Sequence, residues 1–248
     1  MMFLNRFKDK LAVIPIEGPI IDGKIGLFPS FMKSSLEQAE DFLDKIRDDK
    51  HYKGLILEIN SPGGSPYKSK QLARKIDSLN MFKVALIQEQ GTSGAYWIAS
   101  VCDKIVADDL STIGGVGTIS IRPDLTDFLE KLGINIDVQG EGKFKGEGMP
   151  FSEMTEEEKK HRRKMVKDIN ELFKNQIKKR RNIKENSEVF EGKVFLGKEA
   201  KEVGLVDHLG GRETARKVFE KNTGITGLKL KDFGKELRKG PSLLDFIR

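Results

Sequence analysis

The sequence predicts an α/β fold in which parallel strands are covered by helices. Apolar runs of strand length alternate with stretches whose apolar residues fall at helical spacing, and the connections between them are short. With 248 residues, 38% of them hydrophobic, the chain can bury a sizeable core. One compact α/β unit is therefore the expected architecture.

The first half of the chain predicts strands and helices in strict alternation. Glu17-Gly18-Pro19 ends the first strand, and Asn60-Ser61-Pro62-Gly63-Gly64 ends the second. A serine can cap the first helix. The expected elements are a strand at 11–16, a helix from Ser34 or Ser35 through Leu36, Ala39, Leu43 and Ile46, a strand at 55–59, a helix with Leu72, Ile76 and Leu79 on one face, and a strand at 84–87.

The second half repeats the pattern and then adds a long helix. Thr155, with Glu158 three residues on, forms a capping box that opens this charged helix, whose apolar face is expected to cover a core. That face consists of Met165, Ile169, Leu172, Phe173 and Ile177. The other expected elements are a helix at 96–101, a strand at 104–107, a glycine-rich turn at Gly114, Gly115 and Gly117, a candidate strand ending near Ile121, and a β/α-like stretch at 189–211.

These elements suggest three parts: an N-terminal segment at 1–10, one α/β domain at 11–215 and a Lys-rich extension at 216–248. The extension contains Pro241 and is expected to be peripheral. The chain shows no internal repeat and no low-complexity segment.

Charge and composition argue against nucleic acid as a partner. The net charge is +6, but Lys and Arg outnumber Asp and Glu by only 44 to 38, and the two signs are interspersed. The densest basic run, at 178–181, ends a helical pattern, where cations suit the helix dipole. We interpret it as a solvated helix end.

The expected compartment is the cytoplasm. Cys102 is the single cysteine and lies among apolar residues, so it is predicted to be a small buried hydrophobe. No segment approaches the ~18 apolar residues of a membrane span. A short apolar stretch beside basic residues at the N-terminus suggests at most peripheral contact with a membrane surface. Its apolar residues are Met2, Phe3, Leu4 and Phe7.

Two glycine-bearing turns could carry chemistry, because each directly follows a predicted strand. At 60–64 the glycines let the backbone N–H groups point at a negative oxygen, although a tight structural turn would need the same residues. At 91–97, Ser93 stands between a strand end and a helix start. A serine there is usually only a cap, but the Gly94 and Gly64 N–H groups could stabilise an oxyanion formed when Ser93 attacks a carbonyl.

A nucleophilic serine needs a base, and the histidines are poor candidates. His51 is expected in a polar loop, His161 on an exposed helix face, and His208 in a solvated turn. The alternative is a lysine kept neutral by burial, since desolvation lowers the pKa of a lysine. The glycine-lined stretch 142–151 offers Lys143 and Lys145, and spacing alone does not choose between them.

Four ordered motifs together resemble the signal peptide peptidase A family, also called protease IV. They are 57–65 (LEINSPGGS), 92–97 (TSGAYW), Lys145 five residues before Pro150-Phe151, and 204–207 (GLVD). The resemblance runs from about residue 11 to about residue 215, and four motifs in order are far more specific than any one.

The resemblance implies a ClpP/crotonase-like fold of repeated β-β-α units, with no cofactor and no metal. It also implies that Ser93 is the nucleophile, Lys145 the general base, and Gly64 and Gly94 the donors of the oxyanion hole. Members form ring-shaped or dome-shaped homo-oligomers in which the serine and lysine of one site come from different subunits. The substrates implied are signal peptide remnants and other apolar or unfolded peptides.

One departure from the family pattern concerns Gly115. Related enzymes carry a serine there whose hydroxyl helps to orient the lysine, and Thr92, Thr112 or Thr118 are the candidate substitutes. The departure leaves a catalytically weakened oligomeric scaffold as an alternative to the serine peptidase. A crotonase-type enzyme acting on an acyl-CoA is the third reading, because that fold uses a similar backbone oxyanion hole.

Overall fold

The computed structural model describes residues 9–21, 35–184 and 187–238. The chain divides into two compact units: unit 1 contains residues 1–117 and 173–248, and unit 2 contains residues 118–172. The apolar residues predicted to contact a membrane, from Met2 to Phe7, lie outside the described residues. Within the described ranges, no helix combines the length and the apolar character needed to span a bilayer.

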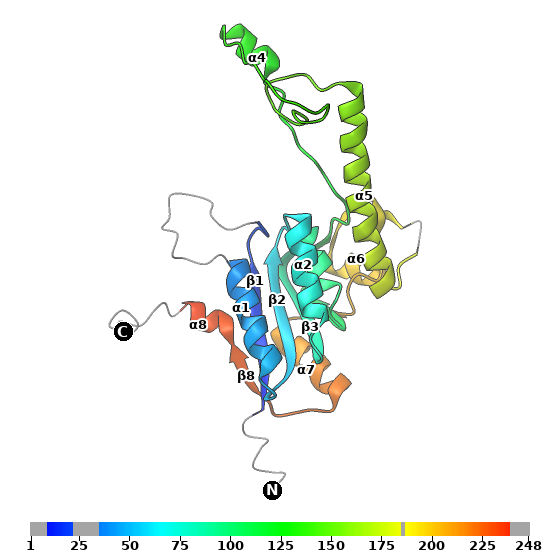
Figure 1. Cartoon of the computed structure of the whole chain (residues 1–248). Coiled ribbons are helices and arrows are strands. Elements are labelled where there is room, and N and C mark those ends of the chain that lie inside the picture. Colours follow the sequence, from blue (N-terminus) through cyan, green and yellow to red (C-terminus); the bar gives the residue numbers. More distant parts are fainter. Residues whose placement is uncertain (1–8, 22–34, 185–186, 239–248) are drawn as a thin grey trace, which may run out of the picture. The chain divides into compact units, whose positions relative to one another are not determined.

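Unit 1 is built on an eight-stranded sheet, counted over the described residues (Figure 1). The strand order is β6-β5-β3-β2-β1-β8, and β4 pairs with both β3 and β7. Every pairing is parallel except that of β5 with β6. The strands are β1 (Lys10–Glu17), β2 (Tyr52–Ser61), β3 (Phe82–Thr92), β4 (Lys104–Ala107), β5 (Thr112–Gly114), β6 (Val194–Leu196), β7 (His208–Leu209) and β8 (Lys229–Asp232).

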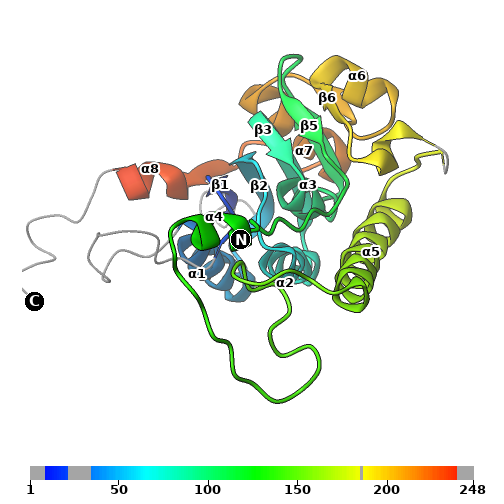
Figure 2. The same ribbon diagram turned by 90° about the horizontal axis from the view of Figure 1, so that it is seen from above.

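Helices cover both faces of this sheet, which explains the continuous apolar runs of β1, β2 and β3. On one face, α1 (Ser35–Asp48), α2 (Pro66–Asp77) and α3 (Gly94–Ala99) pack against residues such as Leu55 and Leu57. On the other face, α7 (Arg212–Thr223) packs against Ile56 and its neighbours (Figure 2). Successive residues of a strand point to opposite faces, so β2 contributes to both cores. The predicted α/β fold with parallel strands covered by helices is confirmed.

The C-terminal part of the described chain belongs to this sheet. β8 pairs in parallel with β1, and Phe233, the first residue of α8 (Phe233–Arg238), is buried and stacks on Phe42 with ring centroids 4.4 Å apart. The residue 215/216 boundary proposed from the sequence falls inside α7. The fold thus continues into the Lys-rich stretch that was expected to be peripheral, as far as Arg238, and Pro241 lies outside the described residues.

Unit 2 contains α4 (Thr126–Lys131) and the first part of α5 (Glu156–Arg180). The predicted capping box is present: the Glu158 amide donates to Thr155 Oγ1 at 3.2 Å, and the Thr155 amide donates to Glu158 Oε2 at 2.8 Å. The prediction that one long face of this helix covers a core is wrong for its first half. Only Phe173 and Ile177 are buried, and Met165 is 48% exposed.

The candidate strand ending near Ile121 is also wrong, because residues 115–121 form no strand and the Ile121 side chain is 81% exposed. Strand pairing needs a partner at the sheet edge, and β5 already ends at Gly114. The sheet extends instead through β6, which pairs antiparallel with β5, and η1 (Glu188–Glu191) and α6 (Gly197–Glu202) flank β6 in the chain.

Candidate active site

Ser93 stands at the junction between β3 and α3. Its amide donates to Gly114 O at 2.8 Å, and its carbonyl accepts from the Trp97 amide at 3.0 Å. The first bond ties the residue to neighbouring strand β5, and the second starts α3. Ser93 is therefore held by the backbone on both sides while its side chain stays partly accessible.

The backbone of Ser93 is strained, and its hydroxyl does not cap the helix. It has φ 53° and ψ −126°, the only positive φ at a non-glycine residue in the described part of the chain. Such a conformation costs about 1–3 kcal/mol and clusters at functional sites. The Ser93 side chain makes no cap hydrogen bond to α3. The capping role that is usual for serine at this position is therefore contradicted.

Two glycine amides lie beside this serine. An ideal Cβ built on Gly63 would stand 2.6 Å from Gly94 N and 3.0 Å from Ser93 Cβ. An ideal Cβ on Gly94 would stand 3.3 Å from Gly64 N. Among the described residues, neither the Gly64 nor the Gly94 amide donates to a backbone carbonyl. Both N–H groups are thus available to a ligand at the mouth of α3.

Glycine is required at these positions for steric reasons. Gly63 and Gly64 have φ of +88° and +155°, and a Cβ on Gly64 would stand 2.2 Å from Ile20 O. Ile20 forms an isolated parallel bridge with Gly64, in which the Ser65 amide donates to Ile20 O at 2.6 Å. The bridge fixes the glycine turn, since it ties the turn to the chain segment that follows β1.

The core beneath α3 makes the support of Ser93 rigid. Every residue of α3 is buried. Tyr96 donates its hydroxyl to Leu205 O at 2.8 Å, and its burial raises the pKa of that hydroxyl well above its ordinary value. The Trp97 ring stacks on Phe173, with centroids 4.6 Å apart and planes 3° apart. The aromatic pair in the 92–97 motif thus anchors the helix that carries Gly94.

The 204–207 motif has a structural role in the same framework. Asp207 Oδ2 accepts from the Ile105 amide and from Arg181 Nη1, each at 2.8 Å. Burial would raise the pKa of Asp207, but these hydrogen bonds, together with the charges of Arg181 and Lys104, outweigh burial and lower it. Arg181 is 8% exposed, so the prediction of a solvated helix end at 178–181 is wrong for this residue.

Gly115 lies directly beside the nucleophile candidate. An ideal Cβ on Gly115 would stand 3.3 Å from Ser93 N and 3.6 Å from Thr92 Cβ. Among the three candidate substitutes, Thr92 is adjacent to Gly115, and its hydroxyl donates to Pro62 O at 3.2 Å. Thr112 Oγ1 donates to Glu89 O at 3.3 Å, and Thr118 belongs to unit 2.

Lys145 belongs to unit 2, whereas Ser93, Gly64 and Gly94 belong to unit 1. The pairing of Ser93 with Lys145 is therefore a proposal. Lys145 is exposed, and its amine forms no ion pair with any described residue. Lys143 differs, because its Nζ lies 2.5 Å from Glu157 Oε2. The Lys143 amine thus already has a carboxylate partner within unit 2.

Each of the three histidines has a contact of its own in the described part of the chain. His208 lies in β7 and pairs with Val106 of β4, so the predicted solvated turn is wrong. His51 Nδ1 lies 3.5 Å from Asp9 Oδ1. His161 contacts Glu147 in unit 2, a contact that the sequence pattern did not indicate.

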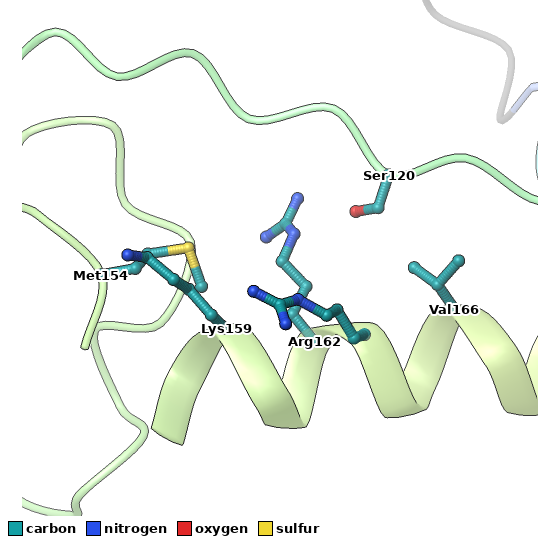
Figure 3. Close-up of a pocket in the computed structure, with 6 residues that line it drawn as sticks. Ser120, Met154, Lys159, Arg162 and Val166 are labelled. Carbon is teal, nitrogen blue, oxygen red and sulfur yellow. The ribbon is translucent and has the colours of Figure 1, made fainter. Parts of the chain in front are cut away.

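A pocket of about 360 Å³ in unit 2 contains none of the predicted site residues; it is lined by Ser120, Met154, Lys159, Arg162, Arg163 and Val166 (Figure 3). Within the described ranges, no group of three or more His, Cys, Asp or Glu side chains could hold a metal ion. Cys102 is buried, as predicted, and burial raises the pKa of its thiol to about 12, which makes it unreactive.

Comparison with known proteins decides the family. Residues 80–226, which include Ser93 and Lys145, match "Peptidase family S49". The chain belongs to peptidase family S49. Among its relatives is "Putative protease MJ0651" of Methanocaldococcus jannaschii, which is 35% identical over 222 residues that cover 87% of this chain and 70% of that protein.

A second relative carries the name of the family that the four motifs resemble. It is "Putative signal peptide peptidase SppA" of Enterococcus faecium, 33% identical over 223 residues that cover 88% of this chain. The chain spans 64% of that relative's length. The predicted membership of the signal peptide peptidase A family is confirmed.

A solved structure supports the fold. It is a mutant of the 1510-N membrane-bound stomatin-specific protease in complex with a substrate peptide, with a TM-score of 0.50 and 14% sequence identity. The match covers 96% of this chain and 95% of that chain. The S49 member described here thus has the ClpP/crotonase-like α/β fold predicted from the sequence.

Proposed function

We propose that this S49 protein is a serine endopeptidase in which Ser93 is the nucleophile and Lys145 the general base. The backbone of Ser93 carries the proposal. A hydroxyl that caps nothing, on a residue with positive φ between a strand and a helix, has the strand-turn-helix geometry of an exposed nucleophile. Family membership makes peptide hydrolysis the reaction class.

The proposed reaction forms and then hydrolyses an acyl-enzyme. Ser93 Oγ attacks the carbonyl carbon of the scissile peptide bond while the neutral amine of Lys145 takes the hydroxyl proton. The Gly64 and Gly94 N–H groups stabilise the negative oxygen of the tetrahedral intermediate. The protonated amine then delivers its proton to the leaving nitrogen, and Lys145 finally activates water to release the acyl group.

Lys145 must be shielded from water to act in this way, and it is exposed in the single chain. We propose that a homo-oligomer supplies the shielding, with the serine of one subunit facing the lysine of its neighbour. Desolvation in such an interface favours the neutral amine. The proposed substrates are apolar or unfolded peptides, including signal peptide remnants, and the proposed compartment is the cytoplasm, with peripheral contact to the membrane.

Activity measurements on single variants test the dyad. We expect Ser93→Ala to abolish both peptide hydrolysis and labelling by a fluorophosphonate. Lys145→Ala is expected to lower kcat by about 10²–10⁴-fold, the usual contribution of a general base. Lys143→Ala is the matched control and should stay near wild type. Near-normal turnover of either dyad variant would refute the assignment.

The rate should rise with pH until Lys145 is fully neutral, because only the unprotonated amine accepts the serine proton. A rate that is flat from neutral to alkaline pH would argue against a lysine base.

Mixing the two inactive variants tests the shared site. If the dyad is formed between subunits, oligomers assembled from Ser93→Ala and Lys145→Ala chains together contain some intact sites, so activity returns. If each subunit carries its own dyad, the mixture stays inactive. Each variant mixed with itself is the control.

Gly115 motivates a second candidate, a catalytically weakened oligomeric scaffold. Its position beside Ser93 N offers no hydroxyl to orient a lysine. An intact oligomer that neither cleaves unfolded peptides nor reacts with a fluorophosphonate at Ser93 would favour the scaffold over the peptidase.

A further inference from the structure

The turn that carries Lys145 is held within unit 2 by few bonds of its own. The Lys145 amide donates to Gly142 O at 2.9 Å, the Glu147 amide to Phe144 O at 3.1 Å, and the Met149 amide to Gly146 O at 3.1 Å. These are local bonds within residues 142–149, a segment that contains three glycines. Such a turn does not hold a long side chain in one place unless other elements of unit 2 fix it.

One fixing contact comes from α5. His161 Nδ1 and Glu147 Oε2 are hydrogen-bonded at 2.6 Å. The His161 ring also lies against the Phe144 ring, with centroids 5.0 Å apart. His161 therefore contacts the residue immediately before Lys145 and the residue two positions after it.

Glu147 is unusual because its side chain is largely shielded from solvent on a largely exposed segment. Its side chain is only 10% exposed, and its second carboxylate oxygen, Oε1, is buried without a hydrogen-bond partner among the described residues. Desolvating a carboxylate costs free energy. A carboxylate kept in this state, with one strong bond to His161, calls for an explanation other than ordinary surface pairing.

A second fixing contact comes from Arg122, at the end of the turn. Arg122 Nε and Nη2 donate to Met149 O at 3.0 and 2.7 Å, and its Nη1 donates to Asp124 Oδ2 at 2.9 Å. The Leu125 amide donates to Pro150 O at 2.8 Å. The Arg122 side chain is also only 10% exposed, so a largely shielded guanidinium fastens the end of the turn. Arg122 thus fixes the end of the turn, and His161 fixes its middle.

We infer that Glu147 and His161 are a positioning pair for Lys145. The inference rests on the proposed function, in which Lys145 is the base. By joining the turn to α5, the pair holds the backbone on both sides of Lys145, so that the amine is presented in one direction. A displacement of about 1 Å in a reacting group can lower the rate about 10²-fold, so a contact that never touches substrate can still control turnover.

The test separates the hydrogen bond from the ring. His161→Asn keeps an N–H donor close to the place of Nδ1, whereas His161→Phe keeps a ring against Phe144 but has no donor. Glu147→Gln keeps the shape of the acceptor but removes its charge. Asp168→Asn is the matched control, because Asp168 forms an exposed ion pair with Lys164 on the same helix, at 2.6 Å.

We expect His161→Phe and Glu147→Gln to lower kcat by about 10- to 100-fold, with KM within about twofold of wild type. His161→Asn should keep at least about a third of wild-type kcat, and Asp168→Asn should match wild type. The pH at which the rate reaches its plateau should not move in His161→Phe, His161→Asn or Asp168→Asn, because these variants keep both the base and the Glu147 carboxylate beside it. Wild-type kcat in both His161→Phe and Glu147→Gln would overturn the inference.

His161 could instead be the base, because a histidine whose Nδ1 is held by a carboxylate resembles the base and orienting acid of a catalytic triad. In that case His161→Asn would be as inactive as His161→Phe, and Lys145→Ala would retain turnover. The first result overturns the positioning role. The second overturns the proposed function itself.

Hydrogen exchange supplies a readout that does not depend on activity. We expect the amides of Lys145, Glu147 and Met149 to exchange faster in His161→Phe than in wild type, and to be unchanged in Asp168→Asn. Equal exchange in all three proteins would refute the positioning role even if the chain cleaved no peptide.

Discussion

The turns that follow β2 and β3 use the same kinds of residue but place their serines differently. Ser65, which precedes α2, has φ −54° and ψ 122°, and its Oγ accepts from the Lys68 amide at 3.4 Å. Ser93, which precedes α3, has φ 53° and its hydroxyl caps nothing. Ser65 thus stabilises a helix, whereas Ser93 costs backbone energy and leaves a free hydroxyl between two glycine amides.

The comparison teaches that a serine between a strand and a helix is not by itself a sign of chemistry. Both turns are glycine-rich and both contain serine, so the residue types do not distinguish a cap from a nucleophile. The backbone dihedral angles do. They are set by long-range contacts, namely the bond from Ser93 N to Gly114 O and the burial of the whole of α3.

Among the substitutions that leave the proposed Ser93 and Lys145 dyad intact, the largest effect is expected from Gly94→Ala. The new Cβ would stand 2.2 Å from Ser69 Oγ and 3.0 Å from Ser69 Cβ, so α2 and α3 would have to separate and the Gly94 amide would shift. Loss of one oxyanion-hole donor lowers kcat by about 10²–10³-fold. Peptide hydrolysis at saturating substrate measures the change.

A second substitution tests the steric cause. Gly94→Ala combined with Ser69→Gly removes both clashing atoms and should recover most of the lost turnover. Ser69→Gly alone is the control. If the double variant stays as slow as Gly94→Ala, contact with Ser69 is not the reason for the loss.

The next effect concerns stability rather than rate. Because Ser93 has positive φ, Ser93→Gly should be about 1 kcal/mol more stable to urea than Ser93→Ala, after the greater chain entropy of unfolded glycine is allowed for. Ser93→Gly should also be at least as stable as wild type. At the other turn wild type should be the most stable, with Ser65→Gly below it and Ser65→Ala lowest. The same order at both positions would contradict a strained Ser93.

Much of the framework was predictable because it follows from hydrophobic periodicity. The strand at 104–107 and the helices of the first half were located from their apolar residues alone. β3 extends beyond its predicted end at Ile87, since the polar residues up to Thr92 pair with β5 and Ser61, and no apolar pattern marks that pairing. β8 was missed for a similar reason, because its sequence, Lys-Leu-Lys-Asp, is that of a charged edge strand.

The candidate site was predictable only in part. The residues Ser93, Gly64 and Gly94 were found from glycine-bearing turns after strands, but the strained φ of Ser93 depends on contacts that no local pattern shows. Lys143 differs from Lys145 in having a carboxylate partner, Glu157. Glu157 lies in α5, fourteen residues further along the chain, so the sequence around the two lysines does not show this contact. The Glu147–His161 contact was missed because the two residues lie fourteen positions apart, and His161 lies on an exposed face of a helix among charged residues.

A smaller effect is expected from Ser65→Ala. Removing the cap should cost about 1 kcal/mol in the free energy of unfolding and leave kcat/KM within about twofold of wild type. Urea denaturation and peptide hydrolysis measure the two quantities. A loss of activity comparable to that of Gly94→Ala would mean that the Ser65 turn takes part in the chemistry as well as in the fold.

The smallest effect is expected from acid, because it involves a single carboxylate in the framework of the Ser93 turn. The pKa of Asp207 in the folded chain lies below its ordinary value of 3.8, so its contribution to stability is complete above that pH and is lost as the pH falls through the lowered value. Asp207 accepts hydrogen bonds from Ile105 of β4 and from Arg181. Leu205, two residues before Asp207, accepts from the Tyr96 hydroxyl of α3. The cap at Ser65 involves no group that titrates in this range.

Hydrogen exchange should therefore distinguish the two turns below pH 3.8. After correction for intrinsic rates, the Trp97 amide, which donates to Ser93 O, should lose protection before the Ser69 amide, which donates to Ser65 O. In Asp207→Asn the difference between the two amides should no longer depend on pH, because the titrating group is gone. If both amides lose protection at the same pH, acid unfolds unit 1 as a whole. The Ser93 turn would then have no separate dependence on Asp207.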